Sequence, residues 1–198
     1  MHRALGHYVR SGYGGGATMA RRLNGTSRTA ARLGAVLQPG AQPDLVAARD
    51  AAIAGGKNAQ SVLDAIVEVI RPVDGTQDAE SSRRAVRDAL SDVLERYPEA
   101  DLLDLDDAQR QYVLERFVGL DVYNRFCLDL GKKLDEHASS PSAASARFAE
   151  VREYIAATVA AEFDKLWASG STPASPDLAR LTQGALREAF KVFEGYLE

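Results

Sequence analysis

The chain has 198 residues, of which 45% are hydrophobic and 26% are charged, and its net charge is −4. These values are typical of one globular domain or at most two small ones, and every apolar run is too short and too often broken by charge to span a bilayer. The start of the sequence lacks the apolar region of a secretory signal, and Cys127 is the only cysteine, so we expect a cytoplasmic protein without disulfides.

The N-terminal segment has a charge opposite to that of the rest of the chain. Residues 1–37 carry six arginines and no acid, so this segment has a charge of +6 and the remainder of the chain has a charge of −10. The six arginines are Arg3, Arg10, Arg21, Arg22, Arg28 and Arg32. Such segregation indicates binding to an acidic partner or to a phosphate backbone. The alternative is that the segment docks on the acidic body of its own chain.

The first elements are short. Residues 2–10 can form a helix, and the glycines of 11–16, SGYGGG, predict a flexible joint or a close backbone approach. They do not form a Walker loop, because no strand precedes them. Residues 17–37 predict two short helices, with a break at Asn24-Gly25 and Thr26 as the N-cap of the second. The proline-containing segment 38–43 then connects this basic arm, residues 1–43, to the body.

Three helices are expected before the middle of the chain. Residues 44–54 are rich in alanine, and the apolar run that follows Ser61 has helical spacing, although its β-branched residues leave a strand as the alternative. Residues 77–97 form a charged helix that Pro98 ends. Its expected inner face consists of Val86, Leu90, Val93 and Tyr97.

The longest predicted helix runs from residue 106 to residue 137 and is roughly 45 Å long, enough to act as the spine of a small domain. Apolar residues recur along it at steps of three or four: Val113, Phe117, Leu120, Tyr123, Cys127, Leu130 and Leu134. Asp121 and Arg125 fall outside this stripe. We therefore predict that they pair on the surface, where such a pair contributes a few tenths of a kcal/mol.

Two further long helices complete the chain. They cover residues 143–168 and 177–197, with Ser175 as the expected cap of the second. Long helices joined by short loops indicate an antiparallel bundle in the C-terminal half. The predicted fold is therefore all-α: a helical bundle over residues 44–198, preceded by the basic N-terminal helical arm.

The sequence offers no set of residues suited to catalysis. His2, His7 and His137 are far apart, and no motif indicates a metal site or a cofactor. The acidic run at 101–107 is typical of a solvated helix start and not of a cation site. Cys127 lies on the apolar stripe, which indicates a small buried hydrophobic residue and not a nucleophile. We therefore expect a protein that is not an enzyme, with no cofactor and no metal.

The arginine segment remains the candidate functional site. The arginine fork suits carboxylates and phosphates equally. Nucleic acid is the second choice of partner, because few aromatic residues accompany the arginines and the protein as a whole is acidic.

The same segment, RALGHYVRSGYGGGATMARRLNGTSRTAARLGAVL, resembles a signature of the QatB component of bacterial Qat anti-phage defence systems. The matching positions are Tyr8, Val9, Arg10, Ser11, Gly12, Arg21, Arg22, Gly25, Thr26, Arg28, Thr29, Ala30 and Leu33. The close match covers about a fifth of the chain. The helical remainder is compatible with the family but less specific.

The resemblance implies a non-enzymatic partner subunit that is encoded with an ATPase, a QueC-like enzyme (QatC-type) and a TatD-like nuclease. It further implies that the subunit is the N-terminally modified protein substrate of the QueC-like enzyme. Because the sequence starts at the motif, we expect either that a native leader was removed or that this homologue lacks the modification site. The residues expected to bind the partner are Arg10, Tyr13, Arg21, Arg22, Thr26, Arg28, Thr29 and Arg32.

Overall fold

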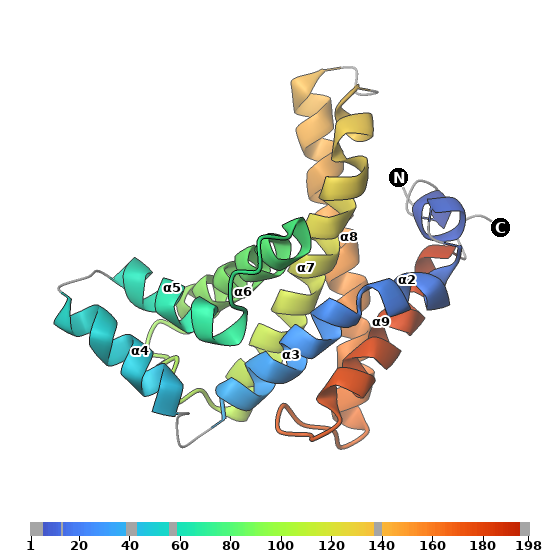
Figure 1. Ribbon diagram of the computed structural model, residues 1–198. Coiled ribbons are helices and arrows are strands. Elements are labelled where there is room, and N and C mark those ends of the chain that lie inside the picture. The colour runs from blue at the N-terminus through green and yellow to red at the C-terminus, as the bar shows by residue number, and fades with distance from the viewer. Residues whose placement is uncertain (1–5, 13, 39–42, 56–58, 137–139, 195–198) are drawn as a thin grey trace.

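The computed structural model describes residues 6–12, 14–38, 43–55, 59–136 and 140–194, and every element in these ranges is a helix (Figure 1). The predicted all-α fold is therefore confirmed. In chain order the elements are a π-helical turn η1 (Tyr8–Gly12), α2 (Gly16–Arg22), α3 (Asn24–Val36), α4 (Pro43–Ala54), α5 (Ala59–Ile70), α6 (Gln77–Arg96), α7 (Asp107–Glu136), α8 (Pro141–Ala168) and α9 (Leu178–Glu194).

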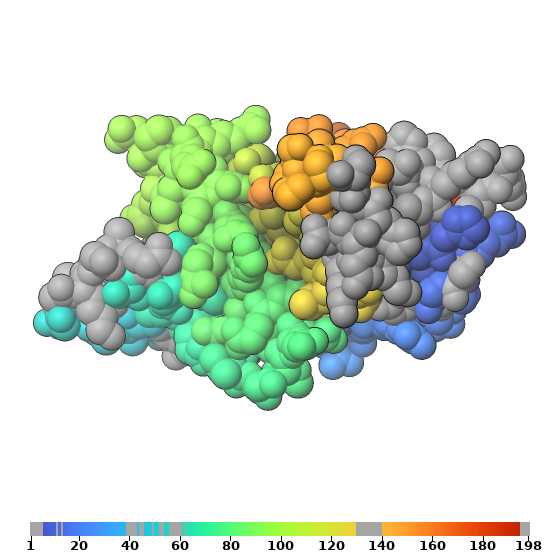
Figure 2. All heavy atoms as spheres, turned by 90° about the horizontal axis from the view of Figure 1, so that it is seen from above, coloured from blue at the N-terminus to red at the C-terminus, as the bar shows by residue number. Residues whose placement is uncertain are grey.

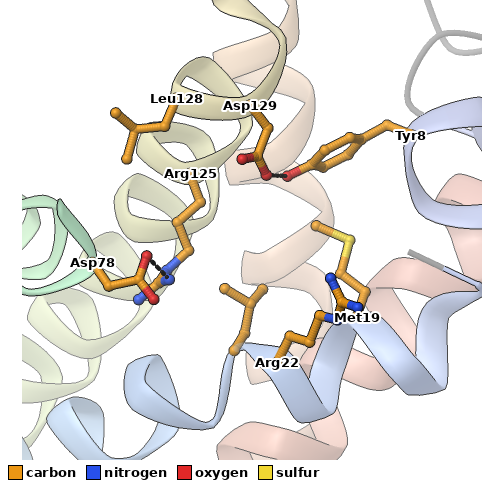
Figure 3. Close-up of a pocket in the computed structure, with 8 residues that line it drawn as sticks. Tyr8, Met19, Arg22, Asp78, Arg125, Leu128 and Asp129 are labelled. Atoms are coloured by element: carbon orange, nitrogen blue, oxygen red, sulfur yellow. Dashed lines mark hydrogen bonds and ion pairs between the residues drawn. The ribbon is translucent and has the colours of Figure 1, made fainter. Parts of the chain in front are cut away.

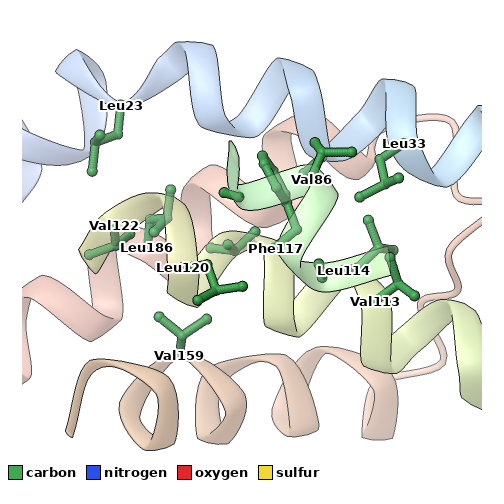
Figure 4. Packing of buried hydrophobic residues seen from close by; sticks show 14 of the residues in the cluster. Leu23, Leu33, Val86, Val113, Leu114, Phe117, Leu120, Val122, Val159 and Leu186 are labelled. Carbon is green, nitrogen blue, oxygen red and sulfur yellow. The ribbon is translucent and has the colours of Figure 1, made fainter. Parts of the chain in front are cut away.

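Helix α7 is the spine of the molecule, as its sequence predicts. It packs against α3, α6 and α8, and Val113, Phe117 and Leu120 of its apolar stripe are buried in the common core (Figure 4). Tyr123 and Cys127 are half-buried against that core, whereas the side chains of Leu130 and Leu134 lie outside the described part. Burial continues around the helix beyond the stripe, because three helices surround it.

Side-chain caps fix the starts of the long helices. The Thr76 hydroxyl accepts the Ala79 N–H at 3.1 Å at the start of α6, and the Ser140 hydroxyl accepts the Ala143 N–H at 3.2 Å at the start of α8. Before α7, Asp106 and Gln109 exchange backbone and side-chain bonds as a capping box does. The observed bounds of these helices lie within two residues of those predicted from the sequence.

Two predicted caps and one predicted break are misplaced. The break between the first two helices falls at Leu23 and not at Asn24-Gly25, so Thr26 lies inside α3 and caps nothing. Helix α5 begins at Ala59, two residues before the predicted cap Ser61. Helix α9 begins at Leu178, after a turn that contains Ser175. The predicted division into two short N-terminal helices and the helical assignment of α5 are nevertheless correct.

The structure does not confirm a basic arm that stands apart from the body. Helices α2 and α3 lie along α9, and α3 also packs against α7 (Figure 1). Their inner face, including Met19, Leu23 and Leu33, belongs to the same buried cluster as Phe117 of α7 and Phe190 of α9. The first and last described helices of the chain are therefore neighbours in space.

Two glycines permit this close packing. A Cβ atom built on Gly16 would lie 3.0 Å from Cβ of Phe190 in α9. One built on Gly34 would lie 2.6 Å from Cδ2 of Leu178 and 2.7 Å from the backbone oxygen of Pro173, well inside van der Waals contact. Helices α2 and α3 can thus approach α9 only because these positions lack a side chain.

We expect Gly34→Ala to lower the free energy of unfolding by about 1–3 kcal/mol, because the new methyl group overpacks a contact with backbone. The gain in helix propensity, about 1 kcal/mol, offsets only part of this loss. Gly184→Ala in α9 is the matched control, since its Cβ would meet no atom within 4 Å. Urea denaturation followed by circular dichroism should show a less stable Gly34→Ala and a Gly184→Ala at least as stable as the parent. Equal gains at both sites would contradict the packing argument.

The remaining helices extend the body outward. Helix α4 packs mainly against α5, which in turn contacts α6 and α3 (Figure 1). Helices α7 and α8 form a long hairpin whose far end projects beyond the other elements. In the described ranges, no helix combines the length and the apolar character needed to cross a membrane.

Candidate functional site

The outer face of η1, α2 and α3 forms a basic surface. It consists of the five arginines of the described N-terminal segment, all of which are exposed: Arg10, Arg21, Arg22, Arg28 and Arg32. On α3 the exposed positions 25, 28, 32 and 35 follow one another at steps of three or four and so form one stripe, and Arg21 and Arg22 are exposed at the end of α2. Residues 1–37 contain no acid, so the charged side chains of the helices that form this surface are all positive.

Four of the five arginines of this surface have no carboxylate as an ion-pair partner among the described residues. The Arg21 guanidinium donates to the Thr18 hydroxyl at 3.0 Å, within its own helix. Among the described residues, no carboxylate forms an ion pair with Arg10, Arg28 or Arg32. The guanidinium forks of these three arginines are therefore available to an external carboxylate or phosphate.

The predicted partner-binding residues divide into two groups. The five arginines reach the surface, but Thr26 and Thr29 are buried, with exposed fractions of 0% and 5%. In this structure the two threonines therefore pack inside the chain and not on its outer face. Tyr13 lies outside the described residues.

Thr26 joins a buried cluster around Asp121 of α7. The fully buried Asp121 carboxylate accepts the Thr26 hydroxyl of α3 at 2.6 Å. It also accepts the hydroxyls of Ser81 and Ser82 of α6, both at 3.1 Å. One carboxylate thus holds three helices together, and the most distant of its partners is 95 residues away in the sequence.

Arg125 supplies the positive charge of this cluster. Its Nε atom lies 3.5 Å from Asp121 Oδ2, and its Nη1 atom lies 2.8 Å from Asp78 of α6. Burial opposes the charged form of Arg125, but the two carboxylates outweigh this effect and raise its pKa. The arginine therefore stays charged inside the protein and links α6 to α7.

The predicted surface pair of Asp121 and Arg125 is wrong in its location. Both residues are buried, because α3 and α6 cover the side of α7 that carries them. The sequence contains one signal of this arrangement. Asp121 is flanked directly by Leu120 and Val122, and both neighbours are also buried, so this stretch of the helix has no solvent face.

A polar pocket of about 350 Å³ opens beside this cluster, between η1, α2, α6 and α7. Figure 3 shows Arg125 and Asp78 on one wall and, on another, the Tyr8 hydroxyl donating to Asp129 at 2.6 Å. Arg22 of the basic surface also lines the pocket. Two carboxylates and two guanidinium groups thus line the pocket, and several of them already pair with one another or with Tyr8.

Cys127 and Tyr123 lie on the other side of α7 and favour no nucleophilic chemistry. Burial raises the pKa of the Cys127 thiol, and a hydrogen bond with Tyr123 offsets only part of this increase. Burial likewise raises the pKa of Tyr123 to about 12. The thiol therefore remains protonated near neutral pH, which supports its interpretation as a small apolar side chain.

Acidic residues in the run before α7 accept hydrogen bonds from nearby backbone N–H groups. Asp101 accepts the Leu103 N–H at 2.9 Å, and Asp106 accepts the Gln109 N–H at 2.8 Å. Of the histidines, His7 is exposed, and His2 and His137 lie outside the described residues. Within the described ranges, no group of three or more His, Cys, Asp or Glu side chains is placed to hold a metal ion.

Comparison with known proteins gives one match. A family model described as QatB, Qat anti-phage system associated protein QatB, covers residues 14–193. Searches of curated proteins and of solved structures find no match. The matched range includes α2 to α8 and nearly all of α9, and so contains both the basic surface from Arg21 onward and the Asp121 cluster.

Proposed function

Because the chain belongs to the QatB family of Qat anti-phage system associated proteins and so has a role in an anti-phage defence system, we propose that it is a non-enzymatic subunit of that system. In this proposal it binds a QueC-like enzyme in the bacterial cytoplasm through the basic surface. The chain would also be the N-terminally modified protein substrate of that enzyme. The ATPase and the TatD-like nuclease of the system are further candidate partners.

The observation that carries the proposal is the row of exposed arginines on α2 and α3. Arginines that remain in water contribute little to stability, whereas arginines desolvated at an interface can dominate its binding energy. Arg28 and Arg32 lie one helical turn apart on the stripe, so both can contact one acidic patch. We therefore expect the partner to present carboxylates opposite α3.

Nucleic acid is the second candidate partner, because the same guanidinium groups also fit phosphates. The two alternatives differ in their dependence on salt. A nucleic-acid complex releases counterions, so its affinity falls steeply and linearly on logarithmic scales as salt rises. Retention on plain duplex or single-stranded DNA at several salt concentrations therefore separates a nucleic-acid binder from a protein-binding subunit.

We expect that replacing Arg21, Arg22, Arg28 and Arg32 together by glutamine abolishes partner binding and leaves the fold intact. All four side chains are exposed, so the melting temperature should change little. The measurement is a pull-down with the co-expressed components of the system, together with a circular dichroism melt of the same variant.

The matched control replaces four exposed cations elsewhere by glutamine: Arg84, Arg180, Arg187 and Lys191. It removes the same charge and should retain the partner. Docking of the arginines on the chain's own body would give the opposite pattern, a lowered melting temperature with normal binding. That pattern, or equal losses of binding in both quadruple variants, would refute a specific role for the basic surface.

A further inference from the structure

A groove runs along the seam between α7 and α8, on the side of α7 away from α3. It consists of two adjoining hollows of about 760 and 320 Å³, which share Arg116 and Ala156. Figure 2 shows the surface hollowed between the yellow-green segment that follows α6 and the orange start of α8. The α8 lining extends from Ser145 to Ala160, which at 1.5 Å per residue is about 22 Å or four helical turns.

The shape of the groove suits the ridge of a helix. Its floor is shallow because Gly119 and Ala156 let the two backbones approach: a Cβ built on Gly119 would lie 3.5 Å from the Ala156 Cα atom. Tyr112, Tyr123 and Phe148 are partly buried and line its length. Large apolar side chains of an incoming helix can therefore reach the floor between aromatic walls.

Two arginines provide charge near the ends of the groove. The Arg96 guanidinium lies over the Tyr112 ring at 4.7 Å, and the Arg152 guanidinium lies over the Tyr123 ring at 6.0 Å. Both arginines are exposed, and among the described residues neither forms an ion pair with a carboxylate. Arg116, between them, is already paired with Asp92 of α6.

Two acidic residues, Glu115 and Glu153, also line the groove, and Glu115 interacts electrostatically with Arg96 without forming a close ion pair. Glu115 accepts the Trp167 indole N–H at 2.6 Å, and burial raises its pKa, an effect that this hydrogen bond and the charge of Arg96 offset in part. Glu153 is exposed at the rim. Arg96 and Arg152 thus remain as cations held on tyrosine rings, and the two rings lie eleven residues apart on α7, about 16 Å along the axis.

We propose that this groove docks an amphipathic helix of another component of the defence system. The helix would insert an apolar ridge between Tyr112 and Tyr123 and would place two acidic residues, three turns apart, against Arg96 and Arg152. Packing this groove on the same groove of a second copy would place arginines against arginines, so we assign the occupant to a component of different sequence with an acidic helix. This interface is separate from the basic surface on α2 and α3, so the chain would bind two partner elements at once.

The test uses the full chain, tagged and co-expressed with the other components of its defence system. Ala157→Trp fills the groove at an exposed position, and the double variant Arg96→Glu with Arg152→Glu reverses both of its free cations. Each should reduce the co-purified amount of one component by about tenfold or more, the effect of losing a central contact. Ala161→Trp, one turn along α8 at an exposed position outside the groove, is the matched control and should retain that component.

A photo-cross-linking residue at Ser145 identifies the occupant directly. A cross-link to an acidic helical segment of another component supports the proposal, whereas a cross-link to a second copy of this chain overturns it. Unchanged co-purification of every component with both groove variants also overturns it, as does an equal loss with Ala161→Trp. A melt of each variant checks folding, and the charge-reversal variant changes only exposed side chains.

Discussion

Replacing Asp121 by alanine is expected to lower the free energy of unfolding by about 3–5 kcal/mol, the usual cost of breaking a buried charge pair. Among the described residues, the change leaves Arg125 with the exposed Asp78 as its one ion partner, and it removes the acceptor for the hydroxyls of Thr26 and two serines. The measurement is urea denaturation followed by far-UV circular dichroism. On a surface pair the same substitution would cost only a few tenths of a kcal/mol.

A double variant separates the electrostatic part of this cost from loss of packing. Combining Asp121→Ala with Arg125→Met removes both charges, so we expect it to be less destabilised than the sum of the single variants. Asp164→Ala on the exposed face of α8 is the control and should change stability by less than about 0.5 kcal/mol. A loss for Asp121→Ala no larger than for Asp164→Ala would show that the buried cluster does not hold the helices together.

Phe117→Ala is the second large effect that we expect, again about 3–5 kcal/mol, because it removes a fully buried ring from the centre of α7. Figure 4 shows the ring between α7 and the two helices α3 and α6, so several neighbours would have to move to fill the cavity. A thermal melt and a urea titration both measure this loss.

The control for this substitution is Leu128→Ala, on the same helix but with 52% of the residue exposed. Like Phe117→Ala, it replaces a large apolar side chain by alanine, but at an exposed position. It should therefore lower the free energy of unfolding by less than about 0.5 kcal/mol. If Phe117→Ala melted at the parent's temperature, the assignment of α7 as the buried spine would be wrong. Similar losses at both positions would indicate a general intolerance of α7 to alanine.

Local patterns predict most of the helical framework of this protein. The spacing of Val86 and Leu90 in α6 and of Phe117 in α7 predicts the inner faces of these helices, and all three side chains are buried. The same patterns place the arginines of α3 outward, as observed for Arg28 and Arg32. Such predictions succeed because the spacing of apolar residues along a single helix is enough to show which of its faces is buried.

The buried cluster could not be predicted in the same way. The environment of Asp121 depends on which helices cover α7 from a second and a third side, and α3 and α6 come from distant parts of the sequence. Thr26 also satisfies the local rule for an N-cap, but its hydroxyl binds a carboxylate 95 residues away. Local preference was overridden there by a tertiary contact, which a single sequence does not display.

The contact between α2, α3 and α9 also constrains how a ribosome can deliver this protein. Synthesis is vectorial, so the apolar face of α2 and α3 emerges first and must wait for α9, the last described helix, before it is covered. Until α9 is made, the apolar residues of α2 and α3 that face it stay exposed to water. The helices that carry the basic surface therefore rest on a packing contact that is completed late in synthesis, although α3 also packs against α7.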